Sequence, residues 1–247
     1  MFELVLVALA GVAAGAVNTA VGSGSLITYP VLLLAGLPPV TANITNTIGL
    51  APGALAGAWA YRFELRRQRR AIVVLVPISI AGAIAGASLL LSLPSTAFTI
   101  IVPVLIIASA LLVGLQPLMV RLRGRKRREG WVPLSLSIAG ASVYGGYFSA
   151  AQGIILLGIL GIFRAPDLQA QNALKNLLQA VVNVVAATFF LWTTSVNFVY
   201  VVSLVTGSLL GAPLGAWLAR RLSATLFRLV VVIIGLCVGA YLLLSAR

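Results

Sequence analysis

The residue with the clearest capacity for chemistry is Lys175, the one formal charge in the apolar stretch Leu168–Leu191. Polar side chains recur around it at spacings of three or four and so share one face of a predicted helix: Asn172, Lys175, Asn176, Gln179 and Asn183. An ionisable residue at membrane depth is costly and usually faces a cavity or a partner inside the protein. Asp167 lies two turns away, and no acidic residue falls deep inside an apolar segment. A buried cation without a fixed protein anion indicates that the anion is the cargo.

Lys175 also has two structural interpretations. Its long side chain can carry the charge out to the membrane interface, or the amine can lie buried in its neutral form. The sequence of this helix does not decide between these two interpretations and the interpretation that Lys175 binds the cargo.

Two breaks in the apolar pattern, Gly22–Ser25 and Ala150–Gly153, supply further donors. A short apolar piece follows each break, so each break is expected to expose the N-terminus of a short helix. Such an N-terminus carries unpaired N–H groups and about half a positive charge, which favours anions. The candidate donors at the breaks are Ser23, Gly24, Ser25, Gln152 and Gly153.

Thr45 and Asn46 are candidates on the helix that follows the first short piece. Hydrogen bonding between helices and contact with the cargo explain them equally well. With the residues above, the predicted substrate-binding set is Ser23, Gly24, Ser25, Thr45, Asn46, Gln152, Gly153, Asn172, Lys175 and Asn176.

Composition places the chain in a membrane and argues against an enzyme. Of its 247 residues 61% are hydrophobic and 9% are charged, and several apolar runs exceed the length that spans a bilayer. The net charge of +13 comes from short basic runs between apolar segments, which disfavours nucleic-acid binding. Histidine is absent, the four acidic residues lie at or beyond helix ends, and there is one cysteine. Neither a catalytic pair, nor a metal site, nor a cofactor is expected.

The predicted elements follow the apolar runs and their Gly, Pro and Arg boundaries. Glu3 and the lack of a basic start favour a retained first helix over a signal peptide. The expected segments are Phe2–Val21, Leu26–Ala35, Val40–Tyr61, Ala71–Leu93, Ser95–Val120, Trp131–Ser149, Ile154–Phe163, Leu168–Leu191, Val196–Ala219 and Leu222–Leu244.

An internal duplication organises these segments. Gly82–Phe98 and Gly211–Phe227 share eight identities in seventeen positions without gaps, and the same offset aligns Gly24 with Gly153. The expected division is a first transmembrane repeat over 1–120, a basic cytoplasmic linker over 121–130 and a second transmembrane repeat over 131–247. The fold class is therefore an all-α polytopic membrane protein, in which each repeat has a broken, re-entrant helix pair plus three spanning helices.

Charge decides how the repeats should be oriented, because basic residues mark the cytoplasmic side. Arg62–Arg70 and Arg121–Arg128 must both lie there. Four crossings in each half would make the repeats parallel and leave four arginines outside: Arg164, Arg220, Arg221 and Arg228. If each short piece turns back, the repeats are inverted and these arginines are cytoplasmic, which fits the rule better. Inversion also brings the N-termini of both short pieces together near the membrane midplane.

The chain resembles the sulfite exporter TauE/SafE family of anion transporters over nearly its whole length. The resemblance rests on Gly15–Leu34 with its break before Pro30, on Ala42–Asn46, on their repeats in Gly145–Gly161 and Ala170–Asn176, and on Gly211–Ser223. It implies transport of a small anion such as sulfite, sulfoacetate or another organosulfonate by a multi-pass protein of the cell membrane. A passive anion channel of the same fold stays open, whereas a membrane-embedded enzyme and a structural subunit are disfavoured. The bilayer is the other expected partner, and the oligomeric state is left open.

Overall fold

The computed structural model describes residues 2–122, 130–164, 167–219 and 225–245. These residues form helices and no strand, as expected for an all-α membrane protein. The helices are α1 (Phe2–Ala20), α2 (Ser25–Leu34), α3 (Pro39–Ala60), α4 (Arg62–Leu65), the 3₁₀ turn η1 (Arg66–Gln68), α5 (Arg69–Ser92), α6 (Ser95–Leu122), α7 (Trp131–Tyr147), α8 (Gln152–Phe163), α9 (Leu168–Thr193), α10 (Phe198–Ala219) and α11 (Thr225–Ser245). Most of the basic linker expected over 121–130, and Arg220 and Arg221, lie outside the described residues.

The two predicted breaks are present, each followed by a short helix. Gly22 adopts a left-handed φ of +88° between α1 and α2, a conformation that glycine reaches without steric cost. Ser149 and Ala151 hold φ values of 56° and 55° before α8, where a Cβ atom makes the left-handed conformation unfavourable. The second break is therefore the more strained of the two.

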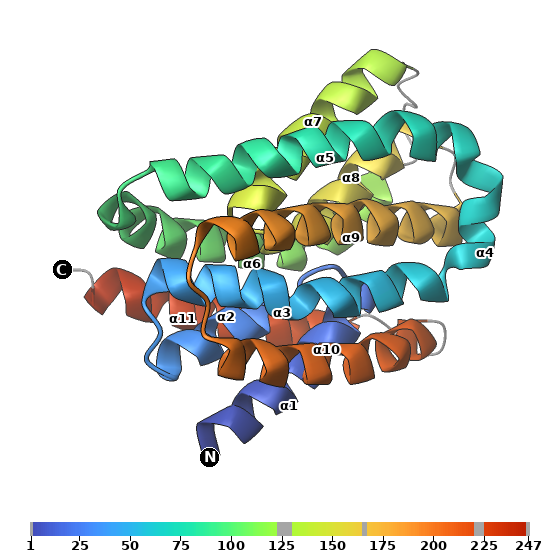
Figure 1. Ribbon diagram of the computed structural model, residues 1–247. Coiled ribbons are helices and arrows are strands. Elements are labelled where there is room, and N and C mark those ends of the chain that lie inside the picture. Colours follow the sequence, from blue (N-terminus) through green and yellow to red (C-terminus); the bar gives the residue numbers. More distant parts are fainter. Residues whose placement is uncertain (1, 123–129, 165–166, 220–224, 246–247) are drawn as a thin grey trace.

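The polar helices α3 and α9 lie side by side in the middle of the molecule (Figure 1). Helix α10 packs against α3 and helix α5 packs against α9. Outside them, α1 packs on α10 and α7 packs on α5, while α6 and α11 pack on each other. Each half of the chain thus contributes its first helix to a pair with a later helix of the other half.

Glycines make these outer pairs possible because the backbones touch. A Cβ atom added to Gly211 of α10 would lie 2.0 Å from the carbonyl oxygen of Val12 in α1. A Cβ atom added to Gly86 of α5 would lie 2.0 Å from the carbonyl oxygen of Val143 in α7. The small-residue motifs of the duplicated segment are therefore packing motifs, as membrane helices use them.

Five helical segments among the described residues are long and apolar enough to cross a membrane; they lie in α1, in the run from α4 to α5, and in α6, α9 and α10. Helix α3 is not among them, and its apolar content is diluted by the buried polar residues Asn43, Thr45, Asn46 and Thr47. Its central place shields these side chains from lipid. Large apolar side chains instead face outward on the peripheral helices, for example Val73, Ile100 and Leu210. The chain is a multi-pass membrane protein.

The connections gather at two ends of the bundle. Helix α4 and the start of α9 lie at one end, and the α2–α3, α5–α6 and α9–α10 connections lie at the opposite end (Figure 1). The arginines of α4 and η1 are therefore at the same end as the N-terminus of α9.

Candidate functional site

Lys175 lies in the interior of the bundle with none of its surface exposed. Its Nζ donates to the main-chain oxygens of Asn18, at 3.3 Å, and Thr19, at 3.2 Å. Both acceptors belong to the last turn of α1, whose terminal carbonyl groups have no partner within the helix. The negative end of that helix dipole stabilises a cation there. Among the described residues, the Lys175 amine is thus held by main-chain oxygens rather than by a carboxylate.

Two neighbours of Lys175 on α9 contact the same turn of α1. Asn176 Nδ2 donates to the Thr19 oxygen at 3.4 Å, and Gln179 Nε2 donates to Asn18 Oδ1 at 2.8 Å. Asn18 Oδ1 also accepts the backbone N–H of Gly24 at 3.3 Å, just before α2 begins. The last turn of α1 therefore joins the polar face of α9 to the first break.

The two breaks are in direct contact. The backbone N–H of Gly153 donates to the carbonyl oxygen of Gly22 at 3.1 Å, and the hydroxyls of Ser25 and Ser149 lie 3.2 Å apart. A Cβ atom on Gly153 would approach Gly22 Cα to 2.4 Å and Gln179 Oε1 to 2.9 Å. The starts of α2 and α8 thus meet beside the polar face of α9.

Thr45 and Asn46 are buried on α3, away from the contacts of Lys175. Asn46 Oδ1 accepts a hydrogen bond from the hydroxyl of Thr28 in α2. The interhelical role that the sequence allowed for Asn46 is therefore present. Within the described part of the chain, Asn46 Nδ2 and Thr45 Oγ1 have no hydrogen-bond partner.

The remaining predicted residues lie around this centre without joining one cluster. Gln152 Nε2 donates to the Ala141 oxygen of α7 at 3.4 Å, while its Oε1 has no partner among the described residues. Ser23 Oγ and Asn172 Oδ1 are likewise buried without a partner in the ranges that the structure describes. The structure brings Lys175, Asn176, Gly24 and Gly153 together and leaves these others at its edges.

Sequence reasoning missed Asn18, Thr19 and Ser149. Asn18 carries the signal that could have revealed it, because it is an amide one turn before a break in an otherwise apolar helix. Thr19 acts through its main-chain oxygen, and side-chain type predicts no such role.

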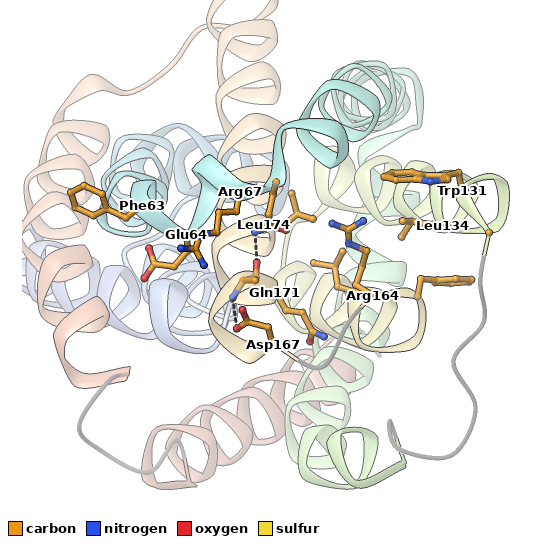
Figure 2. A pocket seen from close by; sticks show the side chains of 14 residues that line it. Phe63, Glu64, Arg67, Trp131, Leu134, Arg164, Asp167, Gln171 and Leu174 are labelled. Atoms are coloured by element: carbon orange, nitrogen blue, oxygen red, sulfur yellow. Dashed lines mark hydrogen bonds between the residues drawn. The ribbon is translucent and has the colours of Figure 1, made fainter.

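A cavity of about 910 Å³ opens at the end of the bundle that holds α4 (Figure 2). Figure 2 shows Glu64 and Arg67 on one side of it and Arg164 and Trp131 on the other. Leu174, next to Lys175 in the chain, also lines it. Gln171, one turn before Lys175 on the same helical face, lines the cavity as well, whereas Lys175 itself is not among its lining residues.

Charged groups at the cavity have defined partners. Asp167 Oδ1 accepts the backbone N–H groups of Gln169 at 3.0 Å and Ala170 at 3.1 Å, which makes it the N-cap of α9. The guanidinium carbons of Arg70 and Arg164 lie 5.1 and 5.5 Å from the centre of the Trp131 ring. These stacking contacts tie α5, α7 and α8 together at the cavity mouth.

No metal centre is evident in the described ranges, where no three His, Cys, Asp or Glu side chains are placed to hold an ion together. The site instead offers amides, hydroxyls, backbone N–H groups and one ammonium. Donors of this kind, gathered at helix breaks inside a membrane bundle, define the class of polytopic membrane transporters.

Comparison with known proteins agrees with this class. The model of the family described as "Sulfite exporter TauE/SafE" matches residues 7–242. The chain belongs to this family of membrane transporters, whose usual location is the plasma membrane.

Three relatives illustrate the similarity. "Probable membrane transporter protein ORF9" of Sinorhizobium sp is 29% identical over 233 residues, which cover 93% of this chain and 88% of the relative. "Probable membrane transporter protein YfcA" of Escherichia coli K12 is 27% identical over 242 residues, covering 95% and 87%. A "Probable membrane transporter protein" of Haemophilus influenzae is 28% identical over 238 residues, covering 93% and 90%. No solved structure matches the chain at a significant level.

Proposed function

We propose that the protein carries small anions, such as sulfite, sulfoacetate or another organosulfonate, through a site where the two helix breaks meet beside Lys175. The observation that carries this proposal is the environment of Lys175. Its amine is fully buried, and the hydrogen bonds that it donates within the described residues go to two main-chain oxygens. A full charge held only by helix-end carbonyl groups is undercompensated in a medium of low dielectric. An anion supplies the missing charge.

Unused donors support an anionic ligand. Ser23 Oγ, in the first break, is buried without a hydrogen-bond partner in the described part of the chain, and Thr45 Oγ1 and Asn46 Nδ2 of α3, away from the contacts of Lys175, are likewise unpaired there. A buried polar group without a partner costs about 1–3 kcal/mol, which a ligand oxygen recovers. The starts of α2 and α8 also bring the positive ends of two helices together, where the N–H groups of Gly24 and Gly153 are engaged by Asn18 Oδ1 and the Gly22 oxygen.

The proposal includes inverted repeats with Arg164 on the cytoplasmic side. Arg70 follows the first basic run, and both Arg70 and Arg164 lie over the ring of Trp131. Arg67 and Arg164 also line one cavity. Parallel repeats would separate Arg164 from Arg67 and Arg70 by the thickness of the membrane, so these contacts support inversion.

The cavity then serves as the cytoplasmic entrance. It reaches Leu174 and Gln171 of α9, and Gln171 lies one turn before Lys175 on the same helical face. Gly22 and Gly153 hold the two breaks in direct contact beside Lys175. Breaks that must separate to admit an anion favour a carrier that alternates its access over an open anion channel.

Isothermal titration calorimetry on the purified protein tests the proposal with sulfite, sulfoacetate, taurine, sulfate and thiosulfate. We expect wild type to bind at least one anion and Lys175→Met to lose that binding, because the substitution keeps the apolar stem but removes the charge. Lys175→Arg should recover it only in part, since the planar guanidinium differs in shape from an ammonium. Leu178→Met, a conservative change at a buried position one turn away, is the control.

The thermal midpoint of each variant shows whether it is folded. Lys175→Met removes two hydrogen bonds to the end of α1, so we expect its midpoint to fall. Unchanged anion affinity in a folded Lys175→Met protein would show that Lys175 only caps α1, and the proposed site would be wrong.

A further inference from the structure

The last turn of α1 presents three oxygens to four donors from other parts of the chain. The oxygens are Asn18 Oδ1, the Asn18 carbonyl and the Thr19 carbonyl. Their donors are Gly24 N, Lys175 Nζ, Asn176 Nδ2 and Gln179 Nε2, at 2.8–3.4 Å. One ammonium, two amides and the N–H group at the start of a helix form a donor set that suits an oxyanion.

We infer that the end of α1 occupies the place of the transported oxyanion in this structure, and that Asn18 is the residue with which the anion competes. This inference rests on the proposed function, because it assigns the same donors to the anion. Asn18 is thus a specificity-determining residue. An anion binds only if it forms stronger hydrogen bonds with Gly24 N and Gln179 Nε2 than the Asn18 side chain does.

Capping of α1 does not by itself account for Asn18. Capping requires the main-chain carbonyls of the last turn, and Lys175 and Asn176 already serve them. The side-chain oxygen of Asn18 instead takes the N–H group of Gly24 and the amide of Gln179. These two groups belong to the start of α2 and to α9, not to α1 itself.

The corresponding corner of the other half gives a comparison. The spacing that relates Gly24 to Gly153 places Tyr147 opposite Asn18, and Asn43 Nδ2 donates to the Tyr147 carbonyl oxygen at 2.9 Å. The main-chain contact is therefore present in both halves. The Tyr147 hydroxyl has no hydrogen-bond partner within the described residues. Of these two positions in the described ranges, only Asn18 accepts hydrogen bonds through its side chain, and Asn18 is the one that lies against α9, the helix that carries Lys175.

Competition links binding to opening. An anion that takes the donors from Asn18 releases the end of α1 from α9 and from the start of α2. Gly22, in the same break, is the residue that contacts Gly153. Occupancy of the site therefore weakens the closed contact between the two breaks. Only molecules in which Asn18 has released the donors can bind the anion. The apparent dissociation constant is therefore the intrinsic constant divided by the fraction of such molecules.

Calorimetry with sulfite and sulfoacetate on two substitutions tests the inference. Asn18→Ala removes the competing oxygen, so we expect a dissociation constant roughly threefold to tenfold lower than wild type. Asn18→Asp tethers a carboxylate beside Lys175, so we expect at least a tenfold weaker affinity. Tyr147→Phe is the matched control in the other half and should leave the affinity unchanged.

Asn18→Ala also removes two hydrogen bonds, so its anion-free thermal midpoint should fall while added anion raises that midpoint by more than in wild type. If the Asn18→Ala protein does not fold, Asn18→Ser is measured in its place. A serine side chain is too short to reach both Gly24 N and Gln179 Nε2. Weaker or unchanged binding in the folded alanine or serine variant would overturn the inference while the proposed function stands. If wild type binds none of the anions, the proposed function fails and the inference falls with it.

Discussion

The N–H group of Gly153 donates a hydrogen bond of 3.1 Å to the carbonyl oxygen of Gly22, although the two residues belong to different halves of the chain. Each lies at a break between a long and a short helix. The contact requires two backbones without side chains between them, which explains why both positions are glycine. It also gives the two halves a direct mechanical connection beside Lys175.

Gly153→Ala should disrupt this connection. The added Cβ atom would lie 2.4 Å from Gly22 Cα, so the two breaks must move apart. Overpacking of this kind costs about 1–3 kcal/mol, and we expect a lower thermal midpoint together with at least tenfold slower transport in proteoliposomes. Gly140→Ala in α7 is the control, since its Cβ atom would meet no heavy atom within 4 Å. Equal transport by the two variants would show that the closed contact is irrelevant to function.

A disulfide across the breaks should inhibit transport reversibly. The hydroxyls of Ser25 and Ser149 lie 3.2 Å apart, so these two short side chains already meet across the breaks, as the partners of a disulfide must. We expect the Ser25→Cys, Ser149→Cys pair, in a Cys237→Ala background, to lose transport on oxidation and regain it on reduction. Each single cysteine variant should be insensitive to oxidant. Full activity of the oxidised protein, with the cross-link verified by mass spectrometry, would mean that the breaks need not separate.

The orientation of the repeats can be measured by cysteine labelling. Because Arg164 shares a cavity with Arg67, we expect position 164 to face the cytoplasm. An impermeant maleimide applied to intact cells should leave Arg164→Cys unlabelled and should label Ser195→Cys, an exposed residue between α9 and α10 at the opposite end. Both variants carry Cys237→Ala. External labelling of position 164 would refute the inverted arrangement.

Arg67 should matter for the approach of the anion from the cytoplasm. Its guanidinium lines the cavity, so Arg67→Ala removes a positive charge from the entrance. We expect uptake into inside-out vesicles to slow by up to about tenfold at low salt, with a smaller difference at 1 M salt, where the screening length is only about 3 Å. The matched control is Arg62→Ala, because Arg62 stacks on Trp59 and Phe63 and does not line the cavity. Equal slowing in both variants would indicate a general charge effect rather than an entrance.

The sequence predicted the helical segments to within a few residues, because hydropathy and the Gly and Pro boundaries act locally along the chain. It also predicted the two breaks, the central polar helix and the family. Its predicted basic segment Arg62–Arg70 forms α4, η1 and the start of α5. The anion site and the inverted repeats remain predictions.

Only the tertiary structure revealed what Lys175 contacts. Its acceptors, the carbonyl groups of Asn18 and Thr19, lie 157 and 156 residues away in the chain and are exposed only because α1 ends there. Likewise, the contact of Gly22 with Gly153 and the shared ring beneath Arg70 and Arg164 depend on how helices of different halves pack. By itself, the sequence determined which residues are apolar, polar or charged along each helix and where each helix can end. Which of these groups meet is decided by packing between distant helices, because a main-chain oxygen that accepts a hydrogen bond leaves no mark in side-chain type, and a glycine does not reveal which backbone it will contact.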